Sequence, residues 1–175
     1  MAVEKFVEWI ISLVTEYLYP GVFAASLIET IFPPIPSEVI FPLAGFIVSK
    51  NQLPFFHVIS LGITGALGST LGALVIYFLA LKIGRERLAK YLKYARVTDE
   101  HLKKVDRWFA RHGEKVVLFG RMIPGIRELV SIPAGFLRMR ILKFLIFTFI
   151  GSSVWSISLS LVGYYFGIAS IQYFG

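Results

Sequence analysis

Charged side chains interrupt apolar sequence at two places in this 175-residue chain, and these are the side chains that could do chemistry. Glu29 and Glu38 flank a proline-rich stretch, and Arg121 and Arg127 flank the dipeptide Pro124-Gly125. An arginine guanidinium keeps its charge and presents a planar fork that matches phosphate oxygens. We therefore expect Arg121 and Arg127 to bind a substrate phosphate. Glu29 and Glu38 are expected to form a charge network with them that couples to protons.

The coupling to protons depends on two opposing effects on each carboxyl group. Burial raises the pKa of a carboxyl group and a neighbouring arginine lowers it, so the sequence leaves the balance open. The alternative is a purely structural role, in which the four charges form salt bridges between the two breaks. A buried ion pair adds little net stability, because desolvation offsets the attraction, and this favours a functional site.

The first break is made by Pro33, Pro34 and Pro36. Proline lacks an N–H group and its ring clashes with the preceding turn, so a helix is expected to end near Phe32. A second helix is expected to begin near Ser37, whose hydroxyl could cap it. Broken backbone at membrane depth persists only where it is buried in protein or lines a wet cavity, and ionisable groups there are candidates for function.

The second break lies within residues 116–137. Gly120, Pro124 and Gly125 interrupt its apolar sequence, and a half-helix is expected to begin near Ile126. The N-terminus of such a half-helix would offer backbone N–H groups and a positive dipole end to an anion.

The composition indicates a membrane protein. The chain is 56% hydrophobic and only 17% charged, whereas about a quarter of a soluble domain is charged. Residues 51–81 and 144–175 carry no charged side chain, and each run exceeds the roughly 20 residues needed to span a bilayer. Cysteine is absent, which excludes disulfides and thiolate chemistry. We expect one all-α membrane domain over residues 1–175.

Basic residues concentrate between residues 82 and 115, where eleven Lys or Arg face five acidic residues. Cytoplasmic loops are enriched in Lys and Arg, so this loop is expected in the cytoplasm and the protein in the cytoplasmic membrane. Recognition of anionic lipid headgroups is the alternative reading. Nucleic acid is not an expected partner, because the aromatic residues lie in the apolar segments.

The chain divides into two similar halves, residues 1–83 and 84–175. Each half contains amphipathic interfacial sequence, then a broken hairpin, then a long transmembrane helix. The amphipathic sequence covers residues 3–19 in the first half and pieces around 88–95 and 102–109 in the second. The hairpins cover residues 21–49 and 116–137. With the basic loop inside, the hairpins are re-entrant from opposite sides, which makes an inverted repeat with its substrate site near the midplane. A full crossing by either hairpin remains open.

Other motifs are weaker. Gly68 and Gly72 let another helix approach closely, either the first hairpin of the same chain or, in a homodimer, a second copy. His57, His101 and His112 are scattered and show no metal-ligand spacing. We predict no catalytic residue, metal site or cofactor, and no enzyme activity.

Two motifs carry a family resemblance: Glu29-x-x-x-Pro-Pro-Ile-Pro-Ser-Glu38, and Phe119-Gly-Arg-x-Ile-Pro-Gly-x-Arg127 followed by Pro133-Ala-Gly135. Through them the chain resembles the DedA family, also described as SNARE-associated or VTT-domain membrane proteins. The resemblance implies two opposed re-entrant hairpins and transbilayer movement of phospholipids or polyprenyl phosphates. Bacterial relatives are implicated in returning undecaprenyl phosphate across the cytoplasmic membrane, with dependence on the proton motive force.

The family's functional acidic and arginine positions fall on Glu29, Glu38, Arg121 and Arg127. Some members carry Asp where this chain has Glu38. The leading hypothesis is a flippase for a phosphate-bearing lipid, above all undecaprenyl phosphate, with proton coupling. The alternatives are a general phospholipid scramblase, a proton- or cation-coupled transporter of a small solute, and a scaffold without transport.

Overall fold

The computed structural model describes residues 2–32, 37–83 and 99–174, and every regular element within these ranges is an α-helix. The three prolines of the first break and the expected amphipathic piece near residues 88–95 lie outside the described residues. The elements are α1 (Ala2–Glu16), α2 (Leu18–Ile31), α3 (Ser37–Lys50), α4 (Phe56–Ile83), α6 (Asp99–His112), α7 (Lys115–Gly120), α8 (Ser131–Phe136) and α9 (Ile141–Phe174).

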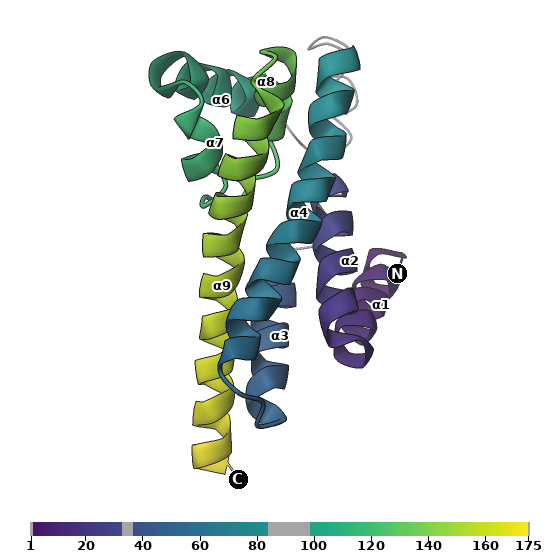
Figure 1. Cartoon of the computed structure of the whole chain (residues 1–175). Coiled ribbons are helices and arrows are strands. Elements are labelled where there is room, and N and C mark those ends of the chain that lie inside the picture. The colour runs from purple at the N-terminus through teal and green to yellow at the C-terminus, as the bar shows by residue number, and fades with distance from the viewer. Residues whose placement is uncertain (1, 33–36, 84–98, 175) are drawn as a thin grey trace.

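Two long antiparallel helices, α4 and α9, form the axis of the molecule (Figure 1). Phe56–Ile83 and Ile141–Ala169 are long and apolar enough to cross a membrane. Large apolar side chains of both helices point outward, including Leu67, Leu71, Ile146 and Ile150. An outward apolar surface of this kind suits contact with lipid chains.

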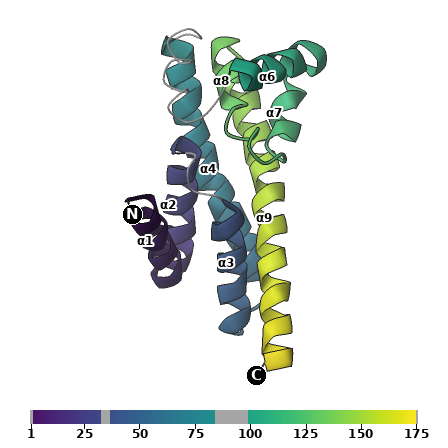
Figure 2. The same ribbon diagram turned by 180° about the vertical axis from the view of Figure 1, so that it is seen from behind.

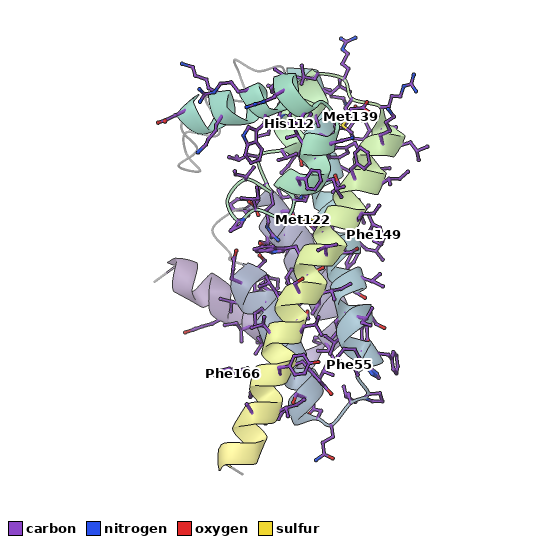
Figure 3. All side chains as sticks on the ribbon, turned by 90° about the vertical axis from the view of Figure 1, so that its left-hand side faces the viewer. Phe55, His112, Met122, Met139, Phe149 and Phe166 are labelled. Atoms are coloured by element: carbon purple, nitrogen blue, oxygen red, sulfur yellow. The ribbon has the colours of Figure 1, made fainter. Side chains whose placement is uncertain are left out.

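The shorter helices form two groups towards opposite ends of this axis (Figures 1 and 2). Helix α2 lies beside α4 and helix α3 beside α9, while α6, α7 and α8 gather round the other end of the axis. Figure 3 places Phe55 and Phe166 at the first end and His112 and Met139 at the second. Met122, next in sequence to Arg121, lies between the two ends.

The small residues of α4 are used inside the chain. A Cβ atom at Gly68 would collide with the carbonyl oxygen of Phe23, and one at Gly72 would lie 2.8 Å from Cβ of Thr30. Helix α2 therefore packs directly on the Gly68 and Gly72 face, as predicted for the first hairpin. Because α2 covers this face, it is not free to pair with a second copy.

Helix α1 ends earlier than the predicted residue 19. The chain bends at Tyr17, and α2 begins at Leu18 with Pro20 in its first turn, where proline is tolerated. A Cβ atom at Gly21 would lie 2.8 Å from Cα of Val14, so α1 folds back closely onto α2. This tertiary contact, which the amphipathic pattern of α1 does not encode, sets the end of the helix.

The second hairpin also differs from its prediction. The returning helix begins at Ser131, and not near Ile126; residues 121–130 form successive turns instead. Gly125 adopts a left-handed φ of 75°, which interrupts a helix. Pro133 cannot donate to the carbonyl of Leu129, so a regular helix can start only where Pro133 falls in its first turn.

Helix α3 of the first hairpin crosses α9 at very close range. A Cβ atom at Gly45 would collide with the carbonyl oxygen of Ser160, and one at Gly163 would lie 2.6 Å from Cα of Pro42. Both obstacles are backbone atoms, which cannot move aside as a flexible side chain would.

Gly163→Val is expected to force α3 away from α9 and to lower the free energy of unfolding by about 3 kcal/mol. Thermal unfolding in detergent, followed by circular dichroism, measures the effect. Ala169→Val is the matched control, because it adds the same side chain at an exposed position of the same helix. Equal unfolding midpoints for the two variants would contradict the proposed crossing.

Candidate functional site

The ends of the two hairpins meet at a buried ion pair. Glu29 at the end of α2 is 3% exposed, and Arg127 in the turns between α7 and α8 is 5% exposed. Nη2 of Arg127 donates to Oε1 of Glu29. The backbone N–H of Ser37, at the start of α3, donates to the same oxygen at 3.0 Å. The structure thus brings together one acidic and one basic residue of the two predicted motifs.

Two residues that sequence reasoning missed complete the surroundings of Arg127. Its Nε donates to Oε1 of Glu128 at 2.5 Å, so two carboxylates share one guanidinium. The ring of Trp155, from α9, has its centroid 5.8 Å from the guanidinium carbon, and its indole N–H donates to the hydroxyl of Ser37 at 3.3 Å. Glu128 could have been found from its place beside Arg127, whereas nothing in the charge pattern points to Trp155.

Arg121 is buried more deeply and is not paired with a carboxylate among the described residues. It is 2% exposed, and its Nη2 donates to the hydroxyl of Ser131 at 2.7 Å. Its Nε has no hydrogen-bond partner in the part of the chain that the structure describes. Gly151 of α9 makes room for it, since a Cβ atom there would lie 2.7 Å from Cβ of Arg121. A buried guanidinium with a free N–H donor is suited to bind an anion.

The other predicted site residues are arranged differently. Glu38 is exposed and forms no ion pair with the described residues, so the four charges do not close into one cluster. The hydroxyl of Ser37 accepts from Trp155, and it is Glu29 that binds the first N–H of α3. The expected capping by Ser37 is therefore replaced by capping from another helix. The sequence did not predict this, because the acceptor, Glu29, belongs to the preceding helix and reaches Ser37 only through the fold of the hairpin.

The helix-break residues of the second motif have distinct roles. A Cβ atom at Gly120 would collide with a methyl group of Val130, so Gly120 lets the two arms of the hairpin approach each other. Pro124 and Gly125 are exposed, and Gly125 provides the left-handed turn between Arg121 and Arg127. The turn places both arginines on the inner side of the hairpin.

A strip of buried hydroxyl groups runs along α9 past the arginines. Its members are spaced four residues apart and so share one face of the helix: Thr148, Ser152, Ser156 and Ser160. The hydroxyls of Thr148 and Ser160 have no hydrogen-bond partner among the described residues. Within the same part of the chain, no three His, Asp or Glu side chains gather as metal ligands would.

Known proteins match this chain over most of its length. The VTT domain family matches residues 35–165. A Lactococcus lactis protein named alkaline phosphatase-like protein is 40% identical over 161 residues, which cover 89% of this chain and 74% of that protein. Undecaprenyl phosphate transporter A of Bacillus subtilis is 34% identical over 158 residues, 90% of this chain and 76% of that protein.

The protein of the same name in Staphylococcus aureus is 31% identical over 159 residues, which cover 86% of this chain and 77% of that protein. No solved structure matches the chain.

Proposed function

Because this chain belongs to the VTT domain family, also called the DedA family, we propose that it moves a phosphate-bearing lipid across a membrane. The resemblance inferred from the two sequence motifs is thereby confirmed. The observation that carries the proposal is the presence of two buried arginines, Arg121 and Arg127, where the hairpins meet. Both can donate to phosphate oxygens, while the apolar outer surface of α4 and α9 leaves the lipid tail in the bilayer.

The proposed orientation follows the arrangement of the helical pairs. Since α2–α3 and α7–α8 lie at opposite ends of α4 and α9, each pair acts as a re-entrant hairpin from its own side of the membrane (Figure 1). The halves 1–83 and 84–175 are then an inverted repeat within one domain. The basic loop 82–115 faces the cytoplasm, and the protein lies in the cytoplasmic membrane.

The proposed substrate is a polyprenyl phosphate, with undecaprenyl phosphate as the leading choice. Two relatives that match most of this chain are named undecaprenyl phosphate transporter. We further propose that Glu29 accepts a proton during the cycle, because its carboxylate is buried and bound to Arg127. Glu38 is exposed beside the same hairpin end, where it receives or releases that proton.

Transport, rather than phosphate ester hydrolysis, is the proposed activity. One relative carries a name that mentions alkaline phosphatase, but the arginines here have no histidine beside them among the described residues. His57 lies against Phe56 and Tyr19, and His101 and His112 belong to α6. The hydroxyl of Ser131 accepts a hydrogen bond from Arg121, and among the described residues it has no hydrogen bond to a histidine or carboxylate that could act as a general base.

Reconstitution in liposomes tests the proposal. The purified protein is expected to move a labelled polyprenyl phosphate between leaflets, and to move it faster under an imposed pH gradient. The matching polyprenol without phosphate should not move. Equal movement of polyprenol and phospholipids would indicate a general scramblase instead. No lipid movement, together with uptake of a small solute or a proton current, would indicate a solute transporter.

A further inference from the structure

We propose that the Glu29 carboxylate occupies the position of the substrate phosphate, so that the two anions bind the same donors in turn. The inference rests on the proposed function, since it concerns the same site and a phosphate monoester as the ligand. It goes further in giving Glu29 the role of a competing ligand.

The first argument is the pair of donors that converge on Glu29. Its Oε1 accepts from the backbone N–H of Ser37, at the start of the 14-residue helix α3, and from the guanidinium of Arg127. A helix N-terminus combined with an arginine fork is the donor set that proteins use for phosphate. The carboxylate therefore sits where a phosphate oxygen would be bound.

The second argument is that the site has donor capacity beyond what Glu29 uses. Arg121 is only 2% exposed, and its Nε has no hydrogen-bond partner among the described residues. Within the same part of the chain, the second carboxylate oxygen of Glu29 is also buried and has no hydrogen-bond partner. A phosphate has more acceptor oxygens than a carboxylate, so it can use the Arg127 donors and the spare donor of Arg121 together.

The third argument is the charge balance, which prevents simultaneous binding. Among the described residues, the positive groups that interact electrostatically with this site are Arg127 and Arg121, and the negative groups besides Glu29 are Glu128 and the exposed Glu38. Helices α4 and α9 bring no charged side chain to this depth, because residues 58–81 and 144–174 contain none. A phosphate added to an ionised Glu29 would leave excess negative charge in a buried place, which is costly. Protonation or withdrawal of Glu29 removes that cost.

The exchange has a structural consequence. The ion pair between Glu29 and Arg127 links the first hairpin to the second. When a phosphate takes the place of Glu29, this link is broken and the ends of the hairpins separate. Substrate binding and opening of the site are then one event, as a carrier with alternating access requires.

Glu29→Gln provides a sharp test, because exchange and a structural role predict opposite results. Glutamine keeps an oxygen that can accept from Ser37 but removes the competing charge. The variant is therefore expected to bind a soluble prenyl monophosphate, geranyl phosphate, at least about tenfold more tightly than the parent protein. Binding is followed through Trp155 fluorescence in detergent, in a background where Trp9 and Trp108 are changed to Phe.

Glu16→Gln is the matched control, because it removes the same charge at an exposed position at the end of α1, a residue with no role in the proposed site. Its affinity for geranyl phosphate should change by less than about threefold, as expected for a solvent-screened charge. Size-exclusion profiles and unfolding midpoints of both variants show that they remain folded. Binding by Glu29→Gln that is equal to or weaker than that of the parent would overturn the proposal.

Further probes separate this inference from the proposed function. Equally tight binding of geraniol would show that only the tail is bound, and would overturn the exchange. Tighter binding of inorganic phosphate by Glu29→Gln would support the exchange and assign it to a soluble anion. If the parent protein moves polyprenyl phosphate in liposomes while Glu29→Gln binds no better, the translocase stands and the exchange fails. If Glu29→Gln binds geranyl phosphate more tightly but the parent protein moves no lipid in liposomes, the exchange stands and the translocase fails.

Discussion

Arg127→Ala is expected to abolish movement of the phosphate lipid and to lower the free energy of unfolding by about 3–5 kcal/mol. The loss of stability has a specific cause. Without the guanidinium, the buried Glu29 carboxylate keeps only the N–H of Ser37 as a hydrogen-bond partner among the described residues. Thermal unfolding in detergent and the liposome assay measure the two effects separately.

The double variant Glu29→Gln/Arg127→Gln separates the charge from the packing. It removes both charges, and the two glutamines still fill part of the space of the original side chains. Compared with Arg127→Ala, it should therefore regain most of the lost stability but none of the transport. Removing both members of a buried pair costs much less than removing one, because no unpaired charge is left.

The control for Arg127→Ala is Lys143→Ala. This change breaks the Lys143–Glu114 ion pair, whose atoms are 2.6 Å apart and whose side chains are 48% and 38% exposed. An exposed ion pair contributes about 0–1 kcal/mol, so the unfolding midpoint should hardly move. Unchanged transport by Arg127→Ala would contradict the phosphate-binding role, and unchanged stability would contradict the buried pair.

The parts of the fold that the sequence could predict are those governed by local chemistry. The proline-rich stretch predicted a helix end near Phe32 and a helix start near Ser37, and the structure has them at Ile31 and Ser37. The two long charge-free runs became α4 and α9. The opposite charges of the two breaks predicted that they meet, and Glu29 does bind Arg127. The first two predictions needed only the pattern within one segment, whereas the third needed the complementary charges of two segments.

The parts that could not be predicted depend on contacts between distant segments. The N–H of Ser37 is bound by Glu29 from α2, and its hydroxyl by Trp155 from α9. The sequence could not assign Arg127, rather than Arg121, to Glu29, because both arginines flank the same turn. The start of α8 at Ser131 follows from Pro133 and Gly125 acting together. The charge pattern identifies the candidate site residues, but the partner of each residue depends on the fold.

The division of the arginines into one paired and one unpaired residue gives each a different expected response to substitution. A paired arginine contributes to stability through the carboxylate that it neutralises. An unpaired buried arginine costs stability, because its desolvation is not repaid by an ion pair. Arg121 has only the neutral hydroxyl of Ser131 as a described partner. The proposed binding of an anion by Arg121 during transport would offset this cost.

Arg121→Met is therefore expected to abolish lipid movement while leaving the free energy of unfolding unchanged or raising it by up to about 2 kcal/mol. Methionine fills a similar space beside Gly151 without a charge, and its flexible side chain adapts to the surrounding packing. Arg121→Lys is the companion variant: it keeps the charge but not the planar fork, so it should retain weak movement of the phosphate lipid. Both are measured in the same liposome and unfolding experiments as Arg127→Ala. An active Arg121→Met, or one destabilised as strongly as Arg127→Ala, would show that Arg121 holds the hairpin together and does not bind the substrate.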